Sequence, residues 1–258
     1  MTRKRIGLAL SGGGARGFAH LGVLKAFAGH SLPIDFVAGT SAGSFVGAAI
    51  ASGLEIDQLI RIAAKIGWFN MTGFSYSPRG LLSNAPMGKF IEQNFPVSRF
   101  EDLPIPFTAV TCDLETGEEV LWKESGDLSF AVRASCAVPG VFTPLMEESG
   151  RRLVDGGVVT PVPAKIVKKM GADIVIAVDL MACGSTFRGV PRTLLGTFFQ
   201  AAMMLLRTAS KNQHYHADII IEPQIAHIRP DELGKRGELM NLGEQAALEK
   251  MDEIKALL

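Results

Sequence analysis

Short apolar runs rich in valine and isoleucine alternate with longer helical patterns along most of the chain. Residues 174–178 are apolar at every position, which is typical of a strand that helices cover on both faces. This alternation predicts βαβ units around a mostly parallel sheet. We expect strands at residues 6–10, 36–39, 107–111, 120–122, 152–154, 174–178 and 219–221, and helices at residues 17–28, 42–52, 56–66, 87–95, 128–137, 163–170, 194–213 and 242–257.

No linker rich in proline, glycine or serine divides the sequence, so we expect one domain over residues 1–258. One segment, residues 67–86, interrupts the alternation with three glycines and two prolines, and it carries the aromatic residues Trp68, Phe69, Phe74 and Tyr76. Long irregular segments in compact domains are often lids or binding loops. The segment is therefore either a lid or lipid-facing loop, or a loop that its own aromatic side chains hold on the core.

The charge balance excludes one large class of partner. Lysine and arginine number 26, as do aspartate and glutamate, so the formal net charge is zero. A nucleic-acid-binding protein would carry a basic excess, and we expect no nucleic-acid partner. The three cysteines, Cys112, Cys136 and Cys183, lie at no metal-ligand spacing, so we expect reduced thiols in a cytosolic protein and no metal site.

Two apolar segments could act as membrane or export signals. The run that follows the basic start ends at Ser11, short of the roughly 7–15 apolar residues that a signal peptide needs. The segment 194–206 is too short to span a bilayer; it suits core packing, a contact in a homo-oligomer, or contact with an acyl chain or membrane. We expect a cytoplasmic protein, or one peripheral to the inner face of a membrane.

A glycine-rich loop, residues 12–17, follows the first predicted strand and opens a helix. The spacing of Gly12, Gly14 and Gly17 satisfies a dinucleotide-binding fingerprint. That fold also needs an acidic residue at the end of the second strand, whereas Asp35 precedes that strand. The other use of such a loop is to direct backbone N–H groups at developing negative charge. Arg16 either adds positive charge beside the loop or forms a surface or helix-capping ion pair.

The sequence Gly39-Thr40-Ser41-Ala42-Gly43 fits the G-x-S-x-G pattern of a nucleophile elbow. A predicted strand precedes it and a helix of small residues follows it, as that motif requires. The start of this helix would also stabilise negative charge near the Ser41 hydroxyl through its dipole. The sequence therefore predicts Ser41 as the nucleophile of an acyl hydrolase.

A serine nucleophile needs a base to accept its proton. None of the five histidines lies in a turn-bounded loop after a strand, where a triad histidine is normally presented; they are His20, His30, His214, His216 and His227. Asp155 ends a short apolar run and precedes Gly156 and Gly157. On these residues alone, an ordinary Asp-Gly turn is the simpler interpretation.

Taken in order, the loop 12–17, the elbow 39–43 and Asp155-Gly156-Gly157 resemble the motifs of the patatin-like phospholipase family. The string 19–24, AHLGVL, is similar to the bacterial branch of that family that is related to neuropathy target esterase. The resemblance covers residues 6–221, and the part after Pro223 carries none of the motifs.

The resemblance implies a three-layer α/β/α fold with a mostly parallel central sheet. It implies a Ser–Asp dyad of Ser41 and Asp155 that cleaves acyl esters of phospholipids, lysophospholipids or related lipids through an acyl-enzyme, with no cofactor. It also implies an oxyanion hole formed by Gly12, Gly13 and Gly14, with supporting positions at Arg16, Gly39, Gly43 and Gly156. The alternatives are a hydrolase of small soluble esters and a regulatory or partner-binding protein with the same fold and little turnover.

Overall fold

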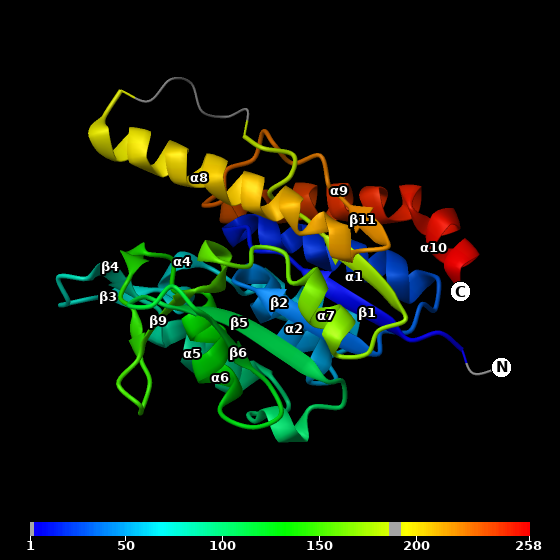
Figure 1. Ribbon diagram of the computed structural model, residues 1–258, viewed down its shortest axis with the longest axis horizontal. Coiled ribbons are helices and arrows are strands. Elements are labelled where there is room, and N and C mark those ends of the chain that lie inside the picture. The colour runs from blue at the N-terminus through cyan, green and yellow to red at the C-terminus, as the bar shows by residue number, and fades with distance from the viewer. Residues whose placement is uncertain (1–2, 186–191) are drawn as a thin grey trace.

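A twisted sheet crosses the centre of the computed structural model, which describes residues 3–185 and 192–258 (Figure 1). The order of its eight described strands is β11-β10-β1-β2-β5-β9-β8, with β6 also paired to β5. The first five of these are parallel, whereas β6 and β9 run antiparallel to β5, and β8 to β9. The strands are β1 (Ile6–Leu10), β2 (Phe36–Thr40), β5 (Phe107–Asp113), β6 (Glu119–Trp122), β8 (Leu145–Met146), β9 (Arg152–Asp155), β10 (Ile174–Val178) and β11 (Ile219–Ile221).

Helices cover both faces of this sheet. The sheet alternates its side chains between faces, so Leu8 joins the large core beneath α1, α2 and α9, whereas Ala9 packs with α7 on the opposite side. The predicted three-layer α/β/α class and mostly parallel sheet are confirmed. The longer helices are α1 (Phe18–Gly29), α2 (Ala42–Ala51), α3 (Ile56–Ala64), α5 (Ala85–Asn94), α6 (Leu128–Ser135), α7 (Ala164–Lys169), α8 (Leu194–Asn212), α9 (Arg236–Glu249) and α10 (Met251–Leu257).

The segment 67–86, expected to be irregular, contains short regular elements. It contains α4 (Trp68–Met71), β3 (Gly73–Phe74) and β4 (Gly80–Ser83), and β3 and β4 form a small sheet with β7 (Gly140–Phe142). Strands this short have too few residues to display an alternating pattern. The helix expected at residues 242–257 is likewise two helices, α9 and α10.

The strand register determines which loops meet. Because β1 and β2 are parallel neighbours, the glycine loop after β1 and the elbow after β2 leave the sheet at the same edge. On the next strand, Val110 pairs with Thr40 and Thr111 pairs with Asp155. The sheet thus brings three distant segments of sequence together. Across residues 3–185 and 192–258, no helix combines the length and apolar character needed to cross a bilayer.

Candidate active site

Ser41 sits at a sharp turn between β2 and α2. Its backbone angles are φ 55° and ψ −124°, and a non-glycine residue in this region carries strain of about 1–3 kcal/mol. Its N–H donates to Ser135 Oγ at 2.9 Å, and its carbonyl accepts the Ser44 N–H at 2.8 Å. These contacts hold the strained conformation that the G-x-S-x-G pattern predicts.

The two glycines of the elbow allow backbone to pack on backbone. A Cβ on Gly39 would lie 2.3 Å from the Gly43 carbonyl oxygen, and one on Gly43 would lie 2.1 Å from the Leu10 carbonyl oxygen. Neither distance is tolerable for a carbon atom. Both positions therefore require glycine for α2 to start directly over the ends of β1 and β2.

Asp155 meets Ser41 at the end of β9. The Ser41 hydroxyl lies near the Asp155 carboxylate and lowers its pKa, and the Gly157 N–H donates to Asp155 Oδ1 at 2.7 Å. Burial raises the pKa of Asp155 to about 6, although the Ser41 hydroxyl and the Gly157 N–H oppose that rise. Asp155 is only 5% exposed and Ser41 7%. Gly156 lets the chain turn here, since a Cβ would lie 2.3 Å from the Val110 carbonyl oxygen.

The glycine loop lies against the elbow, but its three predicted donors are not equivalent. A Cβ on Gly12 would lie 3.3 Å from Ser41 Cβ, so the loop and the hydroxyl are adjacent. The Gly12 N–H is already used, because it donates to the Pro161 carbonyl at 3.2 Å. Within the described residues, the N–H groups of Gly13 and Gly14 have no hydrogen-bond acceptor. The N–H groups of Gly13 and Gly14 are therefore available as donors to a bound group, whereas that of Gly12 is not.

Arg16 is not on the surface, where one of its two expected roles placed it. It is 1% exposed, and Nε donates to the Ile228 carbonyl at 2.8 Å while Nη1 donates to the Gly184 carbonyl at 3.1 Å. Its guanidinium therefore joins the glycine loop to two other loops. Its buried positive charge lies beside the glycine loop, which was the other expected role.

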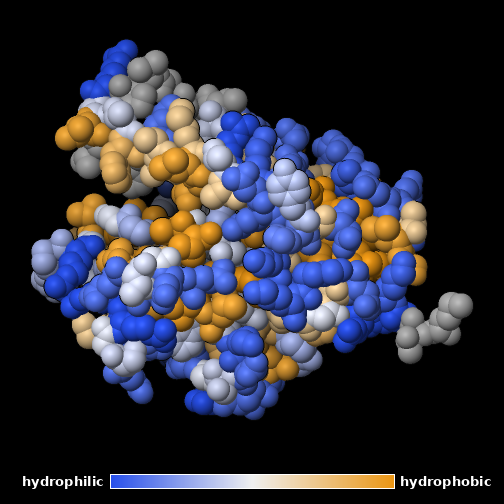
Figure 2. Space-filling view, viewed as in Figure 1, coloured by the Kyte–Doolittle hydropathy of each residue, from blue (hydrophilic) through white to orange (hydrophobic). Residues whose placement is uncertain are grey.

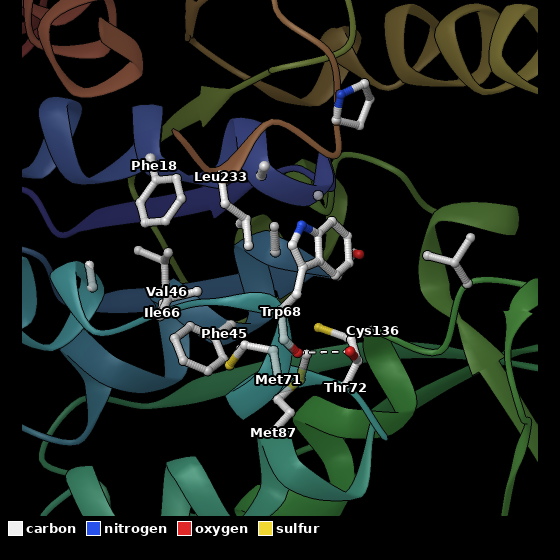
Figure 3. Close-up of a pocket in the computed structure, with 18 of the residues that line it drawn as sticks. Phe18, Phe45, Val46, Ile66, Trp68, Met71, Thr72, Met87, Cys136 and Leu233 are labelled. Carbon is white, nitrogen blue, oxygen red and sulfur yellow. Dashed lines mark hydrogen bonds between the residues drawn. The ribbon is translucent and has the colours of Figure 1, made fainter. Parts of the chain in front are cut away.

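Ser41 opens into an apolar cavity of about 180 Å³. Figure 3 shows side chains from α1, α2, α4 and α5 converging on this space from different sides. They include Phe18, Phe45, Val46, Ile66, Trp68, Met71 and Met87. Such a lining excludes water and accommodates hydrocarbon, so the cavity suits the acyl part of a substrate.

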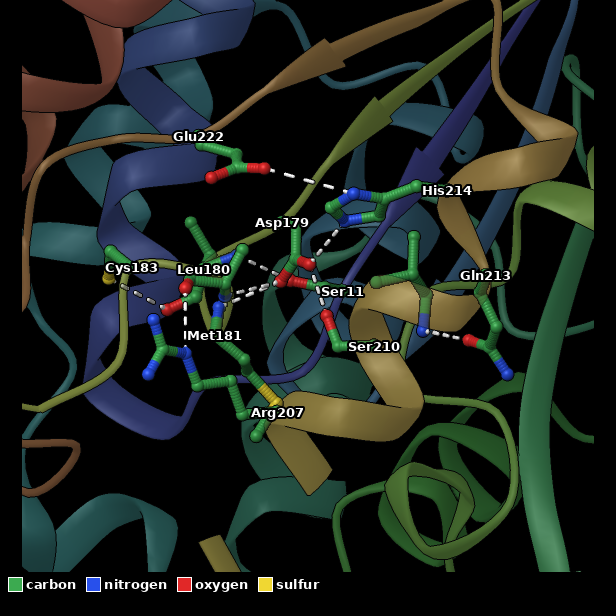
Figure 4. A network of polar contacts seen from close by, with 12 residues as sticks. Ser11, Asp179, Leu180, Met181, Cys183, Arg207, Ser210, Gln213, His214 and Glu222 are labelled. Carbon is green, nitrogen blue, oxygen red and sulfur yellow. Dashed lines mark hydrogen bonds and ion pairs between the residues drawn. The ribbon is translucent and has the colours of Figure 1, made fainter. Parts of the chain in front are cut away.

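The histidines do not replace Asp155. His20 is buried, with Nε2 2.9 Å from the Ser11 carbonyl oxygen, and burial lowers its pKa to about 4, so it is neutral. His214 Nε2 lies 2.8 Å from Asp179 Oδ2, in a network that also holds Ser210 (Figure 4). Among the described residues, neither histidine has a hydrogen bond to Ser41. The network of Asp179 carries no motif and was not predicted from the sequence.

Two further site residues were missed, both at the end of α6. Ser135 accepts the hydrogen bond from the Ser41 backbone, and Cys136 lines the cavity together with Ser41. Burial, aided by the charge of Asp155, raises the pKa of Cys136, so the thiol is protonated and unreactive. Cys112 and Cys183 are also free thiols. No group of three His, Cys, Asp or Glu residues in the described part of the chain could hold a metal.

Comparison with known proteins adds to this geometry. The sequence model of the patatin-like phospholipases matches residues 8–168, which include the loop, the elbow and Asp155. The chain belongs to the patatin-like phospholipase family. It is 38% identical over 179 residues to an uncharacterized NTE family protein of Mycobacterium tuberculosis, covering 68% of this chain and 49% of that protein. It is 36% identical over 188 residues to patatin-like phospholipase domain-containing protein 7 of Rattus norvegicus, covering 70% of this chain and 14% of that protein.

Two solved structures share the patatin fold. VipD from Legionella pneumophila superposes with a TM-score of 0.68 over 98% of this chain and 67% of its own, at 14% identity. The type III effector protein ExoU gives a TM-score of 0.54 over 97% of this chain and 53% of its own, at 12% identity. The patatin-like chain thus spans about half the length of its mycobacterial relative and a small part of its mammalian one.

Proposed function

We propose that the protein is a serine acyl-hydrolase that cleaves acyl esters of phospholipids, lysophospholipids or related lipids. The observation that carries this proposal is that the Ser41 hydroxyl lies near the buried Asp155 carboxylate and lowers its pKa, while Ser41 lines an apolar cavity. Ser41 is the nucleophile and Asp155 the general base. The family name and the names of the relatives support a lipid substrate.

In the first half of the reaction, Ser41 Oγ attacks the ester carbonyl carbon and its proton passes to Asp155. The carbonyl oxygen becomes an oxyanion, which accepts hydrogen bonds from the N–H groups of Gly13 and Gly14. Collapse of this intermediate breaks the bond to the leaving oxygen, which takes the proton from Asp155 and departs as an alcohol. The acyl group remains on Ser41 as an ester, with its chain in the apolar cavity.

In the second half, a water molecule attacks the acyl-enzyme and gives its proton to Asp155. The same two amides hold the second oxyanion, and the fatty acid leaves as Ser41 recovers its proton. Positioned general bases typically accelerate such steps about 10²–10⁴-fold, and loss of one oxyanion donor typically costs about 10²–10³-fold. A single carboxylate thus serves both halves.

Burial makes Asp155 a better base than an exposed aspartate. With a pKa of about 6, the carboxylate is mostly ionised near neutral pH yet binds a proton far more readily than an ordinary aspartate, whose pKa is about 3.9. General bases work best when their pKa is close to the operating pH. The absence of a histidine partner is therefore compatible with catalysis.

The test compares p-nitrophenyl butyrate, p-nitrophenyl palmitate and a lysophospholipid. Ser41→Ala is expected to lower kcat by about 10³-fold or more, and Asp155→Asn by about 10²–10⁴-fold. Ser52→Ala, which removes a buried hydroxyl at the other end of α2, and Asp113→Asn, at a buried aspartate on β5, are matched controls that keep full activity. Full activity in Asp155→Asn would refute the dyad.

A fluorophosphonate probe separates an enzyme from a binding protein with the same fold. The probe phosphonylates an activated serine with loss of fluoride, so wild-type protein is labelled and Ser41→Ala is not. A folded wild-type protein that resists labelling would favour the regulatory or partner-binding role instead.

A further inference from the structure

Two exposed apolar ridges stand on the surface beside the cavity. The α4 ridge comprises Phe69, Phe74, Tyr76 and Leu81, and the α8 ridge comprises Leu194, Phe198, Met204 and Leu205. Phe69 is fully exposed and Leu194 is 88% exposed. Figure 2 shows apolar residues on both sides of a notch, with α8 on one side and the β3–β4 lobe on the other. Contiguous exposed apolar surface of this kind marks an interaction site.

The α4 ridge is continuous with the cavity. Trp68 and Met71 of α4 line the cavity that holds Ser41, whereas Phe69 between them points into solvent. The inner side of α4 therefore lines the cavity, and its outer side exposes the Phe69 ring to solvent. A ligand bound to the ridge is adjacent to the cavity mouth.

The α8 ridge belongs to a helix fixed at its C-terminal end. Asp179 accepts hydrogen bonds from Ser210 Oγ and His214 Nε2, and Arg207 Nε donates to the Ala182 carbonyl at 2.9 Å (Figure 4). The exposed apolar residues lie on the preceding turns, which extend away from the main body (Figure 1). The network thus secures the base of α8 while its apolar turns remain on the surface.

Positive charge accompanies both ridges. Residues 65–89 include Lys65, Arg79 and Lys89, and residues 192–217 include Arg192, Arg207 and Lys211; all six are exposed, and neither range contains an aspartate or glutamate. The whole chain has equal numbers of acidic and basic residues. The two ranges hold six of the 26 lysines and arginines, about their share by length, but none of the 26 aspartates and glutamates. The exposed apolar side chains therefore lie in segments with a local excess of positive charge.

We propose that the two ridges dock on an anionic lipid bilayer, which brings the cavity mouth to the membrane surface. The proposal deepens the proposed function, since it names the physical form in which the lipid substrate is met. Aromatic side chains enter the interface between headgroups and acyl chains, and flanking lysines and arginines attract anionic lipids. A symmetric contact between two copies would instead place like-charged ridges against each other, which is unfavourable.

The test uses Ser41→Ala protein, so that vesicles stay intact, and needs no turnover. Binding to phosphatidylcholine vesicles with and without phosphatidylglycerol is measured by cosedimentation and by the fluorescence of Trp68, the more exposed of the two tryptophans. We expect tighter binding to the vesicles that contain phosphatidylglycerol, a loss of that advantage at high salt, and a blue shift of the emission.

Variants locate the surface. Phe69→Ser and Phe74→Ser are each expected to weaken vesicle binding about tenfold, and Arg79→Gln and Arg192→Gln each about fivefold, only on anionic vesicles. The matched control is the pair Leu114→Ser and Leu248→Ser, at exposed leucines outside both ridges, which leaves binding unchanged. In a background with Ser41 intact, Phe69→Ser and Phe74→Ser keep full activity on p-nitrophenyl butyrate.

Three results would overturn the docking proposal. They are no binding to any vesicle, binding that the ridge variants do not change, and formation in solution of a dimer that Phe69→Ser abolishes. A protein that binds vesicles through the ridges but hydrolyses no ester would refute the proposed function alone. One that hydrolyses soluble esters but ignores vesicles would refute the docking proposal alone.

Discussion

Replacing Asp155 with asparagine tests whether the burial that tunes the base also weakens the fold. The side chain is nearly inaccessible to solvent and has its pKa raised to about 6 by burial. Asparagine has the same shape without the charge. Its carbonyl oxygen can still accept from the Gly157 N–H, and its NH₂ can donate to Ser41 Oγ. The substitution therefore removes the ionisation and little else.

The expected magnitude follows from the pKa shift. The pKa of Asp155 goes from about 3.8 unfolded to about 6 folded, and two pKa units correspond to about 3 kcal/mol. A raised carboxyl pKa means that the folded state binds the proton more tightly than the unfolded state. The contribution of the Asp155 carboxyl group to the stability of the fold is therefore fully present below pH 4 and is lost as the pH rises through 6. The asparagine variant has no such dependence. Its free energy of unfolding should therefore exceed that of wild type by up to about 3 kcal/mol at pH 8, and by little at pH 4.

Urea unfolding followed by circular dichroism at several pH values measures this difference. The midpoint is converted to a free energy of unfolding at constant slope m. The comparison is internal, because any effect of the amide that is unrelated to ionisation shifts both ends of the pH series equally. A difference between variant and wild type that is the same at pH 4 and pH 8 would refute the reasoning. So would a variant that is more stable but still fully active.

Three further predictions concern the same site. For p-nitrophenyl butyrate, kcat/KM should rise with pH through about 6 and then level off, as Asp155 ionises; a level profile down to pH 4.5 would indicate another base. Ser135→Ala leaves the Ser41 N–H without its acceptor, so urea unfolding should show a loss of about 1–3 kcal/mol, together with a lower kcat. Gly43→Ala places a methyl group 2.1 Å from the Leu10 carbonyl oxygen. It should lower the free energy of unfolding by more than about 3 kcal/mol. Gly29→Ala, which meets nothing within 4 Å, is its control.

The main sheet could be predicted from the sequence because its strands are apolar runs bounded by turns. The strands at 6–10, 174–178 and 219–221 coincide with β1, β10 and β11. The short strands β3, β4, β7 and β8 were missed. Strands of two to four residues carry no period of their own, and the pairing of β4 with β7 joins segments about sixty residues apart.

The site residues also differ in whether local sequence could predict them. The elbow at Ser41 is local, since a strand, a turn, small residues and a helix follow one another in the sequence. Asp155 needed the family resemblance, because only the sheet register places it beside Ser41. The roles of Ser135 and Gly12 arise from packing between distant elements. No pattern near either residue could have indicated its hydrogen bond.

The backbone strain at Ser41 can be measured without a substrate, and it bears on whether the turn serves catalysis. A binding protein with this fold would need the cavity and the ridges, but not a serine held at φ 55°. At an ordinary position glycine is less stable than alanine by up to about 1 kcal/mol. At Ser41 the order should invert, because both variants lack the hydroxyl but only glycine adopts a positive φ without strain. Urea unfolding of Ser41→Gly and Ser41→Ala decides this. Should alanine prove the more stable, the turn relaxes without cost and the elbow stores no strain for catalysis.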